Sequence, residues 1–150
     1  MMKATDYEGL QEGAERDAVQ HTVVGIAVRR DSRILLLQRK PDDFQPNLWE
    51  IPGGHVEVGE SIPEAIAREL QEETGWMLQE IIGFVDAFDY DGEAGDATRE
   101  WNFYVRAEMT SALVHPEHQS HAWVGAEDYR NYPMTDEMRR TVGRALGQNG

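Results

Sequence analysis

The chain has 150 residues, of which 40% are hydrophobic and 9% aromatic, a composition typical of one soluble globular domain and not of a disordered segment. Its 28 acidic residues outnumber 14 Lys and Arg residues, which gives a formal net charge of −14. That charge repels nucleic acids and anionic membranes at long range, and no apolar run approaches the roughly 20 residues that cross a bilayer. We therefore expect a cytoplasmic protein with no nucleic-acid or membrane partner, in which any anionic ligand needs a basic pocket or divalent cations. Because the chain has no cysteine, disulfides, thiolate metal ligands and a cysteine nucleophile are excluded.

The predicted elements give a mainly β body with a central and a C-terminal helix. Residues 1–20 lack clear periodicity, and we interpret them as a tail or a short helix before a single domain at 21–150. Runs of β-branched and aliphatic residues predict strands, the first two joined as a hairpin, at 21–30, 33–40, 48–54, 77–90, 100–109 and within 121–129. Polar segments with turn-forming residues predict loops at 41–47 and 91–99. Helices are predicted at about 62–74 and at 135–147, the latter with Thr135 as N-cap and Gly147 as C′ residue. This order of elements indicates the α+β class.

The central helix has clear end signals and an unusual concentration of charge. Ser61 and Glu64 have the spacing of a capping box, and Gly75 supplies a C′ residue. Three glutamates crowd the last two turns: Glu69, Glu72 and Glu73. Like charges at i, i+3 and i, i+4 repel one another, and carboxylates near a helix C-terminus oppose the helix dipole. An ordinary solvated helix face therefore does not explain these residues.

Divalent cations would remove this conflict. Mg²⁺ prefers oxygen ligands, usually a few carboxylates together with water and phosphate oxygens. The adjoining pair Gly53 and Gly54 would let backbone carbonyls approach the same point without interference from a Cβ atom. Arg68 could pair with Glu60 and hold the preceding loop against the helix. The residues thus predict a metal–phosphate site built from a helix and a loop.

From Gly54 to Trp76 the sequence resembles the motif of the Nudix hydrolase family. That motif reads Gly, five residues, Glu, seven residues, then Arg-Glu-aliphatic-x-Glu-Glu-x-Gly-aliphatic. Every fixed polar and glycine position matches, and the one departure is Trp76, where the family usually has an aliphatic residue. The preceding "LWEIPGG" also resembles the family. The resemblance implies an α/β/α sandwich with a mixed central sheet, and cleavage of a nucleoside diphosphate derivative by attack of water at phosphorus.

By position in the motif, the resemblance also implies a ligand set. Glu69, Glu72 and Glu73 would bind Mg²⁺, for which Mn²⁺ can substitute, and the Gly53 carbonyl would complete the set. Glu69 is the better candidate to orient or activate the attacking water. The metal would also screen the negative charge of the protein from an anionic substrate.

Other residues are predicted to support this centre. Glu60 and Arg68 would tie the loop to the helix. Glu117 lies in a segment resembling the one in which many relatives carry Glu-His, and it is either an extra ligand or base or a solvated loop residue. Histidines at every third position suggest zinc as an alternative: His115, His118 and His121. Pro116 argues against that alternative because it breaks any helix that would align them.

Three residues outside the motif are candidates for substrate binding. Phe44, in the loop before the motif, and Tyr90, at a strand end, could stack on a base, although strand aromatics usually pack in a core. Arg39 could contact phosphate or be solvated on the surface.

The partner we expect is a small-molecule nucleotide. Nucleoside triphosphates, oxidised or ordinary, are favoured, given the small size of the chain, and nucleotide sugars of the ADP-ribose type are the alternative. A non-catalytic nucleotide-sensing module is a second alternative, although such modules commonly lack motif glutamates that are all present here. Relatives often form dimers, so the resemblance also allows a homodimer.

Overall fold

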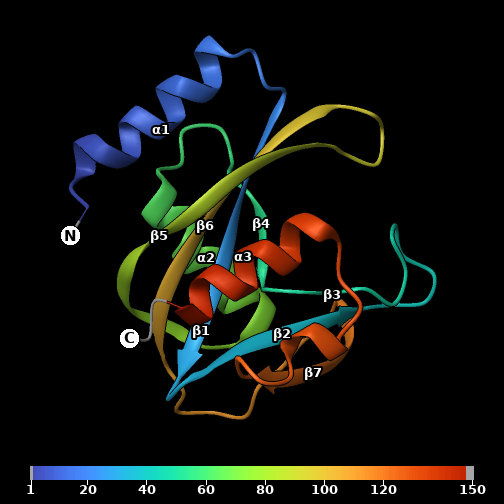
Figure 1. Cartoon of the computed structure of the whole chain (residues 1–150). Coiled ribbons are helices and arrows are strands. Elements are labelled where there is room, and N and C mark those ends of the chain that lie inside the picture. The colour runs from blue at the N-terminus through green and yellow to red at the C-terminus, as the bar shows by residue number, and fades with distance from the viewer. Residues whose placement is uncertain (1, 148–150) are drawn as a thin grey trace.

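The computed structural model describes residues 2–147, which fold into a sheet with helices on both faces (Figure 1). The elements in chain order are α1 (Ala4–Arg16), β1 (His21–Arg30), β2 (Arg33–Arg39), β3 (Trp49–Glu50), β4 (Gly53–His55), α2 (Ile62–Thr74), β5 (Met77–Asp91), β6 (Ala97–Glu108), β7 (His118–Val124), the 3₁₀ helix η1 (Tyr129–Asn131) and α3 (Asp136–Gly147). None of the helices within residues 2–147 is long and apolar enough to cross a membrane.

The first two strands form a hairpin that opens away from its turn. β1 and β2 pair only near the turn, where Arg29 lies opposite Ile34 and Arg30 opposite Arg33. Beyond these residues β1 pairs with β4 and β6, whereas β2 pairs with β3 and β7. The path through the sheet is β3-β2-β1-β6-β5. Because β1 and β6 are parallel and the other pairs are antiparallel, the sheet is mixed, as the family resemblance implied.

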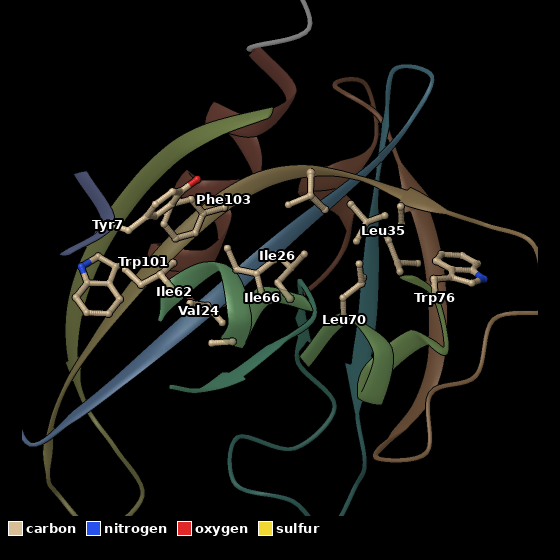
Figure 2. Packing of buried hydrophobic residues seen from close by; sticks show 14 of the residues in the cluster. Tyr7, Val24, Ile26, Leu35, Ile62, Ile66, Leu70, Trp76, Trp101 and Phe103 are labelled. Atoms are coloured by element: carbon tan, nitrogen blue, oxygen red, sulfur yellow. The ribbon is translucent and has the colours of Figure 1, made fainter. Parts of the chain in front are cut away.

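Alternate residues of β1 face two different hydrophobic layers. Val24 and Ile26 are fully buried in a cluster with Leu70 of α2 (Figure 2). Ala27 belongs to a second cluster with Val142 of α3. This alternation follows from the two-residue period of a strand, and it places α2 and α3 on opposite faces of the sheet. The predicted α/β/α sandwich is confirmed.

Of the two alternatives for residues 1–20, the structure has the short helix. Tyr7 and Ala14 of α1 are buried in the cluster on the α2 face, and the Tyr7 ring lies 5.8 Å from the ring of Phe103. The Gln11 side chain donates a hydrogen bond of 3.0 Å to the Glu60 carbonyl. α1 therefore packs beside the loop that precedes α2.

The ends of α2 were predicted correctly because they depend on local contacts. The Ser61 hydroxyl accepts a hydrogen bond of 3.2 Å from the Glu64 amide, and the Glu64 carboxylate accepts one of 2.9 Å from the Ser61 amide. Gly75 ends the helix with φ of +79°, a left-handed conformation that glycine adopts without steric cost.

Strands that depend on distant partners differ from the prediction. The segment 48–54 splits into β3 and β4, because β3 pairs with β2 and β4 pairs with β1. The last strand, β7, begins at His118, before the predicted segment, because it pairs with β2 as far as Arg39, and it ends at Val124. β6 begins at Ala97, within the predicted turn, because it pairs with the whole end of β5 as far as Asp91.

Of the two predicted end residues of the C-terminal helix, one is confirmed and the other is wrong. Thr135 caps α3, because its hydroxyl accepts a hydrogen bond of 3.2 Å from the Met138 amide. Gly147 is itself helical, so its predicted role as the C′ residue is wrong. The helix continues through Gly147, which is the last residue that the structure describes.

Replacing Leu70 by Ala should show how strongly packing anchors α2. Leu70 is fully buried, so the Leu70→Ala variant leaves a cavity and should lose about 2–5 kcal/mol of unfolding free energy in urea titrations. Leu70→Met keeps most of the volume and should lose less than about 1.5 kcal/mol. Equal stability of the Ala variant and the wild type would contradict this packing.

Candidate active site

The last turns of α2 bury two of the three motif glutamates. The Glu69 and Glu73 side chains are 12% and 8% exposed, whereas Glu72 is 59% exposed. The Gly53 amide lies 3.5 Å from a Glu73 carboxylate oxygen and donates to it. A Cβ atom at Gly54 would lie 2.3 Å from the carboxyl carbon of Glu69. Gly54 therefore gives the Glu69 carboxylate the room to pack against backbone, and Gly53 offers its amide to Glu73.

Arg68 connects α2 to the preceding loop and to two of the motif glutamates. Its Nε and Nη2 atoms donate to the Glu60 carboxylate at 2.7 and 2.9 Å, and Nη2 also donates to the His55 carbonyl at 2.8 Å. Its Nη1 atom donates to Glu69 at 2.7 Å and to Glu72 at 3.2 Å. The expected pairing of Arg68 with Glu60 is present, and the same guanidinium partly compensates the charge of the carboxylates.

The negative charge of the buried carboxylates Glu69 and Glu73 is unfavourable unless a cation is bound. Burial raises the pKa of Glu69, and burial likewise raises the pKa of Glu73 to about 7. The negative charge of Glu117 contributes to both shifts, so this loop residue lies near enough to act on them. Carboxylate oxygens of this kind fit a hard divalent cation.

The carboxylates of α2 are not arranged around a single point in this structure. Among residues 2–147, no three His, Asp or Glu side chains lie close enough together to hold a metal ion as they stand. The Nη1 atom of Arg68 lies between Glu69 and Glu72. Because Glu72 is the exposed member of the set, its side chain is the one that can turn away from Arg68 to join a shared ion.

His118 links Glu73 to a second acidic residue that the sequence reasoning missed. Its Nε2 atom lies 2.9 Å from Glu50. Its Nδ1 atom is buried, has no hydrogen-bond partner among residues 2–147, and lies 3.6 Å from Glu73. Burial lowers the pKa of His118, but the two carboxylates outweigh it and the net pKa is raised. The sequence signal for Glu50 was an acidic residue within the apolar "LWEIPGG" segment.

The three histidines of the zinc alternative do not converge. His115 and His121 contact each other, with ring nitrogens 3.3 Å apart. His118 is directed instead at Glu50 and Glu73. This arrangement gives no support to a three-histidine site.

A cavity of about 540 Å³ lies at the open end of the β1–β2 hairpin. The three residues predicted to bind substrate, Phe44, Tyr90 and Arg39, all line it, together with the aromatic side chains of Trp49 and Phe88. Glu50 also lines the cavity, so the contacts from Glu73 through His118 to Glu50 join the α2 carboxylates to it.

Arg39 is more constrained than expected for a surface residue. It donates to the Phe44 carbonyl at 2.6 Å, and it forms ion pairs with Asp43 at 3.0 Å and with Glu50 at 3.1 Å. These contacts hold the loop that carries Phe44 against the strands. Arg39 therefore shapes one wall of the cavity whether or not it also contacts phosphate.

Glu100 is a further cavity residue that the sequence reasoning missed. It is only 8% exposed and lines the cavity from β6. Burial, followed by the charges of Glu50 and Asp86, raises its pKa to about 8. The signal in the sequence was that the polar residues Glu100 and Asn102 alternate with the aromatic residues Trp101 and Phe103 at the start of a predicted strand.

Comparisons with known proteins agree on one family. The NUDIX domain model matches residues 19–145. The chain is 34% identical over 112 residues to the CTP pyrophosphohydrolase of Escherichia coli (strain K12), which covers 75% of this chain and 81% of that protein. It is 32% identical over 133 residues to the nucleoside triphosphatase NudI of the same strain, with 82% and 94% covered. The crystal structure of the MutT NUDIX hydrolase from Burkholderia pseudomallei has a TM-score of 0.71 at 26% identity, with 83% and 96% covered.

The buried Glu100 should make stability depend on pH. Its pKa is raised from 4.5 to about 8 on folding, so its contribution to stability is complete below about pH 4.5 and is lost as pH rises to about 8. The Glu100→Gln variant lacks this titration. Its unfolding free energy relative to wild type should therefore rise across this window, by at most about 1.4 kcal/mol per pH unit.

Urea titrations at pH 5, 6.5 and 8 measure this difference. Glu108→Gln, at an exposed position of the same strand, is the matched control and should leave the pH profile unchanged. Parallel profiles for wild type and Glu100→Gln would contradict the raised pKa.

Proposed function

The chain belongs to the Nudix hydrolase family, and on that premise we propose that it hydrolyses a pyrophosphate bond of a nucleoside triphosphate with the aid of Mg²⁺ or Mn²⁺. One observation carries the proposal: the buried carboxylates of α2 are joined through His118 and Glu50 to an aromatic-lined cavity. The relatives named as a CTP pyrophosphohydrolase and a nucleoside triphosphatase support a triphosphate as substrate. Nucleotide sugars of the ADP-ribose type are the alternative substrates.

The carboxylates of α2 are the groups proposed to hold the metal. Glu69, Glu72, Glu73 and the Gly53 carbonyl would be its ligands, with Glu117 as an additional ligand or base. When bound, the cation supplies neutralisation of phosphate charge and activation of water. Together with Arg68, it answers the repulsion that a protein of net charge −14 exerts on a polyphosphate.

Glu69 is the group proposed to orient the attacking water. Its carboxylate is held at 2.7 Å by Arg68, and this contact opposes the rise in its pKa caused by burial. An ionised Glu69 can accept a proton from the water while the oxygen of the water bonds to phosphorus. The bond from that phosphorus to the pyrophosphate leaving group then breaks. Arg68 and Glu60 are positioning residues in this scheme, because they fix the loop and the Glu69 side chain.

The cavity is proposed to hold the nucleoside. Phe44, from the loop after β2, and Tyr90, from β5, both contribute rings to its lining, and base–aromatic stacking contributes about 1–3 kcal/mol per base. Arg39 would act chiefly by holding the Phe44 loop in place, since its donors already bind Phe44, Asp43 and Glu50. A cytoplasmic location and small nucleotides as partners are part of the proposal, and a homodimer stays a prediction.

Replacing Glu73 by Gln should abolish turnover while the fold is kept. The proposal predicts release of pyrophosphate from nucleoside triphosphates by the wild type with Mg²⁺ or Mn²⁺, and a loss of at least about a hundredfold in kcat for the variant, because a neutral amide cannot replace a carboxylate ligand. Glu108→Gln is the matched control and should retain full activity.

The assay should use triphosphates, dinucleoside polyphosphates and nucleotide sugars in parallel. Turnover confined to nucleotide sugars would select the alternative substrate. Tight nucleotide binding with no turnover on the whole panel would instead favour a sensor module and would overturn the proposed hydrolysis.

Divalent cations should stabilise the protein against heat. A ligand present at 100 times its dissociation constant adds about 2.7 kcal/mol to the unfolding free energy, so Tm should rise with added Mg²⁺ or Mn²⁺. The increase should be much smaller for Glu73→Gln and unchanged for Glu108→Gln in differential scanning fluorimetry. A Tm that is insensitive to both cations would count against the assigned ligands.

A further inference from the structure

A buried hydrogen-bond network fixes the orientation of the Asn102 amide. Asn102 is fully buried in β6, and its Nδ2 atom donates to Asp86 at 3.0 Å. Asp86 also accepts from the Thr141 hydroxyl at 3.0 Å and forms an ion pair with Arg144 at 2.8 Å. An ionised carboxylate only accepts hydrogen bonds, so the nitrogen of Asn102 must face Asp86. The amide oxygen must therefore face the other way.

On that other side, the Asn102 oxygen approaches the same point beside Gly25 as a carboxyl oxygen of Glu100. A Cβ atom at Gly25 would lie 1.9 Å from Oδ1 of Asn102 and 2.8 Å from Oε2 of Glu100, so both oxygens approach the same point beside β1. Both atoms are enclosed, and neither has a hydrogen-bond partner within the part of the chain that the structure describes. Two acceptors without a donor are costly to bury. A proton on Oε2 removes the cost, because it makes that oxygen a donor to Asn102.

The surroundings of Glu100 favour this neutral form. Burial is the largest cause of the raised pKa of Glu100, and the charges of Glu50 of β3 and Asp86 of β5 raise it further. Other acidic residues also line this cavity, namely Glu137 of α3 and, at the β5–β6 turn, Asp91, Glu93 and Asp96. The cation Arg39 is already engaged by Glu50 and Asp43.

The position of this proton determines what the cavity offers to a ligand. Glu100 lines the cavity while its Oε2 atom is enclosed, which leaves Oε1 as the oxygen that a ligand can reach. With the proton held on Oε2 by Asn102, Oε1 can only accept a hydrogen bond. A base that turned a keto oxygen towards it would place two acceptors face to face.

We propose that Glu100 is a specificity-determining residue whose Oε1 atom accepts a hydrogen bond from the exocyclic amino group of a nucleobase. The enzyme then prefers nucleotides with an amino-bearing base to their keto counterparts. This inference rests on the proposed function in one respect, namely that the nucleoside occupies the cavity. Asn102 is the positioning residue, because it acts through Glu100.

Binding of nucleoside monophosphates tests the proposal without requiring hydrolysis. Isothermal titration calorimetry compares CMP with UMP and AMP with IMP, because the two members of each pair differ by an amino or a keto group at one position of the base. At least one amino nucleotide should bind about tenfold more tightly than its partner, since an unpaired buried acceptor costs about 1–3 kcal/mol. The ratios of kcat/KM for the corresponding triphosphates should follow the same order.

Three variants identify the group responsible. Glu100→Leu should bring the preferred ratio close to one. Glu100→Asp withdraws the carboxyl group by one methylene and should also lower the ratio, so it serves as the test if the Leu variant does not fold. Glu100→Gln should retain the preference, because its amide nitrogen can donate to Asn102 while its oxygen still accepts. Glu108→Gln, at an exposed position of the same strand that does not line the cavity, is the matched control and should keep the wild-type ratio.

The outcomes separate this inference from the proposed hydrolysis. No amino preference in the wild type, an unchanged ratio in both Glu100→Leu and Glu100→Asp, or loss of preference in Glu100→Gln would overturn the role of Glu100. An amino preference that depends on Glu100, in a protein that hydrolyses no triphosphate, would support that role and reject the hydrolysis.

Discussion

The burial of negative charge between α2 and the glycine strand β4 is the constraint on which the site depends. Carboxylates lose hydration when they pack against backbone, and that loss must be offset by hydrogen bonds or opposite charge. Here Gly54 leaves space for Glu69, the Gly53 amide faces Glu73, and apolar contacts hold α2 against the sheet. The structure thus keeps the carboxylates close to the backbone at the cost of an unfavourable electrostatic arrangement.

Arg68 meets this constraint with two separate parts of one side chain. Its Nε and Nη2 atoms bind Glu60 and the His55 carbonyl, which secures the loop. Its Nη1 atom binds Glu69 and Glu72. Because guanidinium is rigid and planar, Nη1 stays in place as long as the loop contacts persist, and a cation would have to draw Glu69 and Glu72 away from it. The structural task of Arg68 therefore persists when its electrostatic task passes to a cation.

How much could be predicted from the sequence depended on the range of the interactions. The limits of α2 and the Arg68–Glu60 pair follow from residues within one or two helical turns or a short loop, and the sequence pattern predicted them. The split between β3 and β4, the start of β7, and the roles of Glu50 and Glu100 depend on strands that meet only in the folded chain. Glu117, His118 and Tyr90 could be marked as candidates, but their neighbours could not be assigned. A register of strand pairs is not encoded in any single segment.

The parallel pairing of β1 with β6 also has a consequence for the order of folding. β1, β4 and α2 all lie within the first half of the chain and can come together while it is being synthesised, whereas β6 is made much later. Pairings between distant segments form slowly because their loops are entropically costly to close. Until then one edge of β1 remains unpaired, and unpaired edges are prone to aggregation. The carboxylate-bearing half of the protein is thus assembled before the wall that holds Glu100, and a nascent chain has the former without the latter.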